Sequence, residues 1–204
     1  AGVFYGTLKN AINYSPNDVS AATPAYRRTG FGIKLGYGTT KNYIDLYLLR
    51  AQDHQSSIDE FWWDRLTAQE NIVVGAKGRW QIATPLALTA NIAASIFSTD
   101  MNAQKVETEE TQKWEGLYDV RYSSLMRWAG DVNLTANFKN FSMALTYKLV
   151  QPDYMSLGVS YMSNNYHSLG LSFNTRIWKL NISGNVSAQS DNLSKEQLYT
   201  TRGF

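Results

Sequence analysis

Apolar side chains recur at every second position over one stretch of the chain after another. From Thr29, one set of alternate positions carries Phe31, Ile33, Leu35 and Tyr37, with glycines and Lys34 between them. The same alternation runs through residues 86–97, 126–138, 141–149 and 178–188. Successive side chains of a strand point to opposite faces, so a period of two predicts strands with one apolar and one polar face.

The alternating runs predict nine full strands and the beginning of a tenth. Their ranges are 3–12, 27–38, 42–52, 71–82, 86–97, 126–138, 141–150, 167–176 and 178–190, and the tenth begins within 199–204. An ordinary strand has ~5–6 residues, whereas a tilted strand that crosses a bilayer needs ~9–11. The lengths of these runs favour membrane-spanning strands.

The connections between these strands alternate between long and short. The long ones are 13–26, 53–69, 98–124, 151–166 and 191–199, and the short ones fall near 39–40, 83–85, 139–140 and Ile177. Long loops at one end and tight turns at the other are typical of outer-membrane barrels. We therefore predict an all-β chain, a single domain over 1–204, that forms an antiparallel transmembrane β-barrel.

The strand count predicts that the barrel extends beyond these strands. Bacterial barrels close with an even number of strands, and a tenth strand that stops at the loop end cannot close the sheet. We expect the chain to be part of a larger barrel.

Aromatic residues mark the turn end of the apolar face. They are Tyr37, Trp80, Phe138, Phe141, Phe173 and Trp178. Amphipathic rings prefer the headgroup level of a membrane, so these positions indicate an aromatic belt. Strand propensity alone is the alternative explanation.

The amino-acid composition argues against several classes of protein. Charged residues make up 18% of the chain, below the ~25% of an average soluble domain. A net charge of +2 does not give the basic surface of a nucleic-acid-binding protein. The chain has no cysteine, which excludes disulfides, thiolate nucleophiles and cysteine-ligated zinc. We expect no cofactor and no metal site.

Several segments resemble large outer-membrane β-barrel proteins of Bacteroidota. They are PAYRRTGFGIKLGYG (24–38), NYIDLYLLRAQD (42–53), QENIVVG (69–75), YKLVQPDYMSLGVSYMSNNYHSLGLSFN (147–174) and SDNL with TTR (between 190 and 202). The resemblance implies a β-barrel in the outer membrane of a Gram-negative bacterium, and it carries over no functional residue. Such proteins are much longer than this chain, which agrees with a part of a larger barrel.

Charges on the polar face predict how a lumen would be lined. Two-residue turns would place Lys34 opposite Asp45 and Asp131 opposite Lys148, where opposite charges neutralise each other. The cations left without a predicted partner are Arg28, Lys77, Arg79, Arg127 and Lys179. Their excess would favour anionic solutes in a water-filled pore. Alternatively, they pair with carboxylates on other strands or on a plug.

Two arginines and three tryptophans suggest contacts beyond the sheet. Arg27 and Arg50 fall on the apolar face at the loop end, where they could bind lipopolysaccharide phosphates or form an exposed rim. Trp62, Trp63 and Trp114 lie in long loops. They could anchor another envelope protein, although such residues more often fold a loop onto itself.

The histidines offer little support for catalysis. His54 and His167 both fall at the loop ends of strands, and Ser168 follows His167. Adjacent residues of a strand point to opposite faces, so His167 and Ser168 cannot act on each other. We predict no enzyme.

The sequence thus predicts an integral outer-membrane protein, either a porin-like channel or the barrel subunit of a larger envelope complex. A secreted soluble β-sandwich or adhesin is the alternative, and an outer-membrane barrel hydrolase is less favoured.

Overall fold

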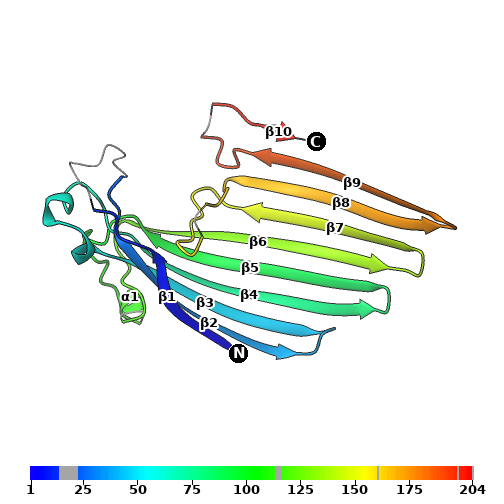
Figure 1. The fold of residues 1–204 in the computed structure, drawn as a ribbon, viewed down its shortest axis with the longest axis horizontal. Coiled ribbons are helices and arrows are strands. Elements are labelled where there is room, and N and C mark those ends of the chain that lie inside the picture. The colour runs from blue at the N-terminus through cyan, green and yellow to red at the C-terminus, as the bar shows by residue number, and fades with distance from the viewer. Residues whose placement is uncertain (14–22, 114–115, 160, 197, 204) are drawn as a thin grey trace.

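The computed structural model describes residues 1–13, 23–113, 116–159, 161–196 and 198–203. Ten strands form one antiparallel sheet in chain order, so the chain is all-β as predicted (Figure 1). The strands are β1 (Gly2–Lys9), β2 (Arg27–Gly38), β3 (Tyr43–His54), β4 (Glu70–Ala83), β5 (Leu86–Ser98), β6 (Ser124–Asn137), β7 (Phe141–Val150), β8 (Tyr166–Ile177), β9 (Leu180–Asp191) and β10 (Arg202–Gly203).

Helices are few and short in the described residues. Two 3₁₀ turns, η1 (Gln55–Ser57) and η2 (Glu60–Trp62), lie in the β3–β4 loop, and α1 (Glu109–Gln112) lies in the β5–β6 loop. Thr108 caps α1, because its hydroxyl accepts a hydrogen bond from the Thr111 amide at 3.2 Å. No described helix has the length and apolar character needed to cross a membrane.

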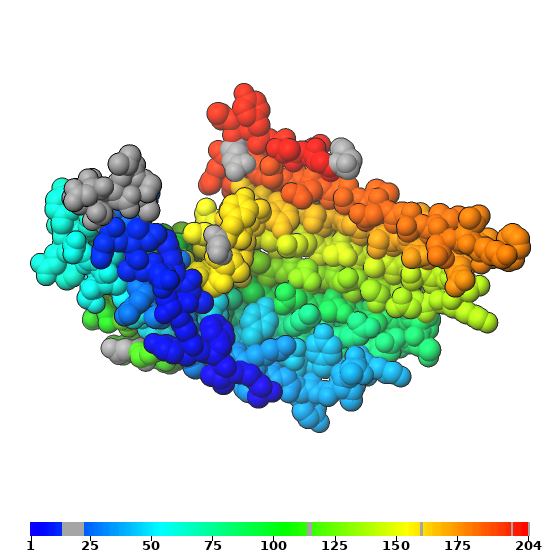
Figure 2. Space-filling view, in the orientation of Figure 1, coloured from blue at the N-terminus to red at the C-terminus, as the bar shows by residue number. Residues whose placement is uncertain are grey.

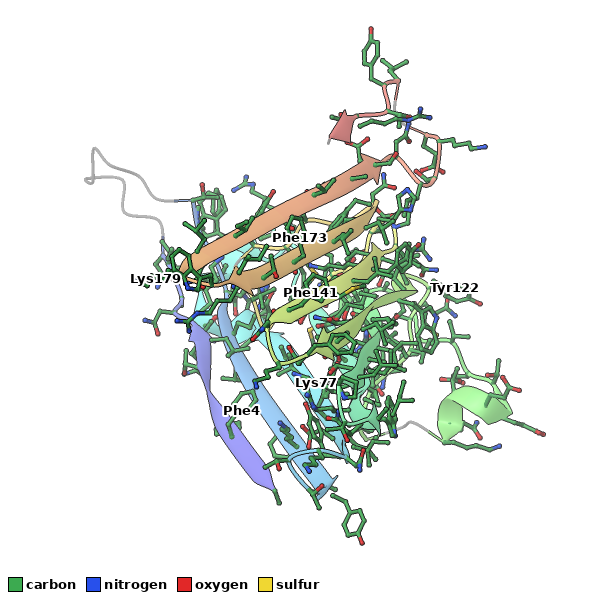
Figure 3. The ribbon with its side chains drawn as sticks, turned by 90° about the vertical axis from the view of Figure 1, so that its right-hand side faces the viewer. Phe4, Lys77, Tyr122, Phe141, Phe173 and Lys179 are labelled. Atoms are coloured by element: carbon green, nitrogen blue, oxygen red, sulfur yellow. The ribbon has the colours of Figure 1, made fainter. Side chains whose placement is uncertain are left out.

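The sheet is curved and open. Figure 3, seen from the turn end, shows the strands following an arc. The outermost strands are β1 and β10, and they do not pair with each other within the described residues. The structure therefore leaves two sheet edges without a ladder partner.

Turn lengths alternate as the sequence predicts. Short turns join β2 to β3, β4 to β5, β6 to β7 and β8 to β9 at one end, and the long loops lie at the other (Figure 1). The β6–β7 turn has the predicted register, which places Asp131 opposite Lys148.

The β2–β3 turn is longer than predicted. Gly38 pairs with Tyr43, which leaves residues 39–42 in the turn. The Thr39 amide donates to the Asn42 carbonyl at 2.7 Å, and the Asn42 amide donates to the Thr39 hydroxyl at 3.2 Å. Gly38 has a φ of +132°, a backbone conformation that side chains disfavour. The predicted opposition of Lys34 and Asp45 is therefore wrong, since Lys34 lies opposite Tyr47 and Asp45 lies opposite Gly36.

Most other strand ends differ from the sequence prediction by one or two residues, and the differences at β1 and at the β8–β9 turn change what the residues there do. Strand β1 ends at Lys9, and an isolated bridge between Ile12 and Ala25 continues its pairing with the chain before β2. At the other end, the β8–β9 turn consists of Trp178 and Lys179, because Ile177 pairs with Leu180. Trp178 and Lys179 thus belong to a turn and not to β9.

Candidate functional site

One face of the sheet is apolar from β2 to β9. Directly opposed residues share a face, so the ladder places Ile33, Leu48, Val74 and Ala94 together and continues the set across the sheet. We call this the apolar face. Its large side chains are substantially exposed, among them Leu35, Leu46, Val74, Ile92, Trp128, Val132, Leu145, Leu169, Leu171, Ile182 and Val186.

A polar network borders the apolar face at the loop end. Arg50 binds Glu70 through Nη2 and Oε1 at 2.7 Å, and Glu70 is only 2% exposed. Farther along, the Ser98 hydroxyl lies 2.6 Å from the Tyr118 hydroxyl and 2.5 Å from that of Ser124. The apolar character of this face therefore ends abruptly where the loops begin.

Aromatic side chains border the same face at the turn end. The predicted set is exposed throughout: Tyr37, Trp80, Phe138, Phe141, Phe173 and Trp178. Phe138 and Phe141 stack across the β6–β7 turn with ring centroids 6.4 Å apart. Trp178 has a φ of 55° in the β8–β9 turn, in the left-handed region that favours glycine. The apolar face is thus bounded by polar contacts at one end and by aromatic rings at the other.

The opposite face is polar, and the β7–β8 loop folds over it. We call residues 151–165 the inner loop. In Figures 1 and 2 the inner loop, in yellow, lies in front of the loop ends of the middle strands. Its Tyr154 packs on Val73, Ala93 and Val150, while Leu157 packs on Ala51 and Phe97.

Hydrogen bonds from β4 and β5 hold the inner loop in place. Asn71 is fully buried, and its Oδ1 accepts the Leu157 amide at 3.0 Å. Its Nδ2 donates to the Ser95 hydroxyl at 2.7 Å and to the Ile96 carbonyl at 2.9 Å. The Ser95 hydroxyl in turn donates to the Met155 carbonyl at 2.5 Å. Two polar side chains of the strands therefore satisfy backbone groups of the loop that burial would otherwise leave without partners.

Between the inner loop and the strands lies a cavity of about 590 Å³. We call it the inner cavity. Tyr47, Asn91 and Asp131 form a chain on its floor, since the Tyr47 hydroxyl donates to Asn91 Oδ1 at 2.8 Å and Asn91 Nδ2 donates to Asp131 at 3.1 Å. Lys148 Nζ lies 5.4 Å from the centre of the Tyr166 ring. Burial raises the pKa of Tyr154 in the loop to about 12.

Two of the cations predicted to lack partners have carboxylates beside them. Arg28 binds Asp53 in a bidentate manner, with Nε at 2.7 Å and Nη2 at 3.0 Å, and also reaches Gln69 at 3.1 Å. Arg127 Nη2 lies 3.8 Å from Asp153 of the inner loop. The prediction missed Arg28 because its two-residue turn shifted β3 by two positions, which moved Asp53 away from Arg28.

The remaining lumen candidates lie in three different settings. Lys34 reaches Asp45 diagonally, at 2.9 Å, although the two are not directly opposed. Lys77 and Arg79 lie on the polar face of β4, and no ion pair involves either of them among the described residues. Lys179 lies in the β8–β9 turn with its Nζ 5.3 Å from the centre of the Trp178 ring. Lys77 lies directly opposite Asp45, which also binds Lys34, whereas Arg79 lies opposite Tyr43, so Arg79 is the β4 cation without an opposed carboxylate.

Arg27 and Arg50 lie on the apolar face at the loop end, in different surroundings. The Arg27 side chain is exposed, and its backbone amide donates to the Ser57 hydroxyl at 2.8 Å. Arg50 is held by Glu70 and also donates to the Gly116 carbonyl at 3.4 Å. Arg27 is therefore better placed than Arg50 to bind an external anion.

The β3–β4 loop folds onto neighbouring segments. Tyr26, Ile58 and Ala68 form a buried cluster against which Trp62 and Trp63 pack. Trp62 and Trp63 thus contribute to packing within the loops. Trp114 lies outside the described residues.

The two histidines have different neighbours, a hydroxyl group for His54 and an aromatic ring for His167. His54 Nε2 lies 2.7 Å from the Thr29 hydroxyl, and the His167 ring contacts the edge of Tyr147 with centroids 6.3 Å apart. Ser168 lies on the polar face opposite Lys148, away from His167. No cluster of residues that could hold a metal ion is present in the described part of the chain.

Comparisons with models of known protein families, with curated proteins and with solved structures found no match to this chain.

The contacts that hold the inner loop on the polar face were not predicted from the sequence. Asn71 and Ser95 read as ordinary polar positions of alternating strands, and nothing in their spacing pointed to the inner loop. A usable signal was present within that loop: Tyr154, Leu157 and Met162 give it more apolar side chains than a solvated loop needs.

Proposed function

We propose that this chain is part of an outer-membrane β-barrel whose polar face lines a water-filled channel. The observation that carries the proposal is the exposed apolar face, bounded by polar contacts at the loop end and aromatic rings at the turn end. Exposed apolar surface on this scale is unfavourable in water and favourable against lipid. The strands β2 to β9 have 10 to 14 residues each, enough to cross a bilayer.

The open edges of the sheet extend the proposal to strands beyond β1 and β10. Backbone groups at a sheet edge cannot bind water within hydrocarbon, so a membrane-spanning sheet must close. We propose that further strands, from the same polypeptide or from another chain, complete the barrel. If another chain supplies these strands, this protein is the barrel subunit of a larger envelope complex. The two open edges, at β1 and β10, are where such a chain would pair.

The inner loop gives the channel its shape. A loop that folds onto the polar face between β3 and β7 narrows any channel lined by that face. Lys77 and Arg79 lie nearer the turn end of the same face, so we propose a modest preference for anionic solutes.

Lipid headgroups are proposed to contact the rims of the apolar face. The exposed Arg27 is suited to lipopolysaccharide phosphate, because a guanidinium binds phosphate oxygens bidentately. We assign no catalytic role to the chain, and the proposed partners do not include nucleic acid.

The experiment that tests the proposal starts from the native membrane. The intact protein is purified in mild detergent, its mass and copurifying proteins are measured, and it is inserted into planar bilayers. Stepwise conductance from the protein alone supports a channel. Absence of conductance together with a stoichiometric partner supports a barrel subunit.

A secreted β-sandwich or adhesin predicts a different result. In that case a second sheet would cover the apolar face, and the protein would stay monodisperse at high concentration without detergent. Such behaviour would contradict the membrane proposal.

A further inference from the structure

The inner cavity combines aromatic rings with hydrogen-bonding groups of both kinds. Tyr47, Tyr154, Tyr161 and Tyr166 all contribute to its lining, and Tyr161 is 85% exposed. A volume of about 590 Å³ lies within the ~300–1,000 Å³ of small-molecule sites. The cavity is therefore large enough for a solute of two or three rings.

The polar groups of the cavity suit hydroxyl groups better than ions. Asp131 accepts hydrogen bonds, Lys148 donates them, and Asn91 does both, whereas a hydroxyl group is at once donor and acceptor. Asp131 and Lys148 face each other across the β6–β7 ladder, so the opposite charges balance and neither an anion nor a cation is favoured here. The electrostatics of this cavity thus differ from those near Arg79, which lies opposite Tyr43 and not opposite a carboxylate.

The tyrosine rings suit the C–H faces of a sugar ring. An exposed ring such as that of Tyr161 gains by covering its apolar face, while its hydroxyl stays in water. The groups that line the cavity are held in place before a solute arrives. Tyr154 of the inner loop is buried, and hydrogen bonds link Tyr47 through Asn91 to Asp131.

From this combination we propose that the inner cavity binds a neutral oligosaccharide. The C–H faces of the sugar would stack on Tyr161 and Tyr166, and its hydroxyl groups would bond to Asp131, Lys148 and Asn91. This inference rests on the proposed channel in that the inner cavity would be a binding site for a neutral solute within it. Binding itself does not require conduction, so the two can be tested separately.

The test measures binding by calorimetry on the full-length protein in detergent. The probes are maltotriose, cellotriose and chitotriose. At least one is expected to bind, and Tyr161→Leu and Asp131→Asn are each expected to weaken it about tenfold, the usual effect of losing one strong contact. Tyr161→Phe keeps the ring and is expected to bind as the natural protein does.

Matched control variants are available on the same sheet. Tyr37 is as exposed as Tyr161, at 86%, but lies at the turn end of the apolar face, so Tyr37→Leu should leave binding unchanged. Asp45→Asn removes a carboxylate of the polar face that does not line the cavity. No binding of any probe, or equal loss in the cavity and control variants, would overturn the inference.

Conductance measured on the same preparation separates the two proposals. A conducting protein that binds none of the three probes would leave the channel standing and overturn the saccharide site. A protein that does not conduct but binds a probe through Tyr161 and Asp131 would uphold the site and contradict the channel.

Discussion

Buried polar side chains are concentrated where the loops meet the strands. Asn71 and Ser95 hold the inner loop, Glu70 holds Arg50, and Asp53 holds Arg28. Each satisfies groups that are wholly or partly removed from water, and a buried group without a partner costs about 1–3 kcal/mol. Single substitutions at these positions should therefore have local effects that are large compared with those at the exposed alternating positions.

Replacing Asn71 should release the inner loop. Asn71→Leu removes the acceptor of the Leu157 amide and the donor to Ser95, so local opening of residues 155–157 should become easier by about 1–3 kcal/mol. Faster hydrogen exchange at the Leu157 amide would measure this. Asn133→Leu is the matched control, because Asn133 lies on the same face and its buried Oδ1 has no hydrogen-bond partner in the described structure. Equal exchange in both variants would contradict the role given to Asn71.

The pair of Arg50 and Glu70 should be strongly coupled. Glu70→Gln leaves a partly buried guanidinium without its counter-charge, at a cost of about 3 kcal/mol in the free energy of unfolding. Adding Arg50→Met should recover much of that loss, since the uncompensated charge is then removed. Urea unfolding from lipid vesicles would give the three free energies. Additive effects of the two substitutions would show that the pair does not interact.

At the scale of elements, the strands follow their side-chain alternation, while the loops follow contacts across the sheet. The β5–β6 loop is held partly by charge: Lys105 Nζ lies 2.8 Å from Asp119, and Arg121 lies 3.5 Å from the same carboxylate. An isolated bridge between Lys105 and Arg121 brings the two arms of the loop together.

Acid should loosen this loop. The hydrogen bond from Lys105 lowers the pKa of Asp119 below its ordinary value of 3.8. A carboxyl with a lowered pKa stabilises the folded loop above the pKa of the unfolded chain, and this stabilisation is lost as the pH falls through the folded pKa. Protease cleavage within residues 103–123 should therefore be slow at about pH 5 and rise below about pH 3.5. The Asp119→Asn variant should be cleaved at a similar rate at both pH values. If its cleavage still rises in acid as in the natural protein, Asp119 is not the group responsible.

At the scale of the whole molecule, the arrangement of charge on the polar face is uneven. Arg28, Lys34 and Arg127 lie beside carboxylates, whereas Lys77 and Arg79 do not form ion pairs within the described residues. A channel lined by this face would thus carry part of its available positive charge on β4, while Arg176 of β8 lies on the same face and also forms no ion pair within the described residues.

Reversing that charge should change ion selectivity. Lys77→Glu combined with Arg79→Glu should shift the reversal potential of the channel towards cations, because fixed charges in a narrow pore select counter-ions. Lys41→Glu, in the exposed β2–β3 turn, serves as the control and should have little effect. A natural channel that prefers cations, or a double variant with unchanged selectivity, would contradict the proposed lining. The shift should shrink at high salt, where charges are screened.

The amino-acid sequence by itself determined the strands and the two faces of the sheet. Side chains alternate along a strand, so the face of each residue follows from its position whether or not the turn length is known. The β2–β3 turn illustrates this, because an error of two residues kept every side chain on its face and changed only the partners across the ladder. That error hid the contact between Arg28 and Asp53 and misplaced Lys34 relative to Asp45.

Only the tertiary structure decided the shape of the polar face. The contact between Asn71 and Leu157 joins residues 86 positions apart, and no periodicity within either segment encodes it. The inner loop folds inward because apolar side chains and backbone groups at its centre find partners on β4 and β5, a condition that depends on the curvature of the sheet. Alternation thus specifies faces locally, whereas the cavity between loop and strands arises from contacts that exist only once the sheet has formed.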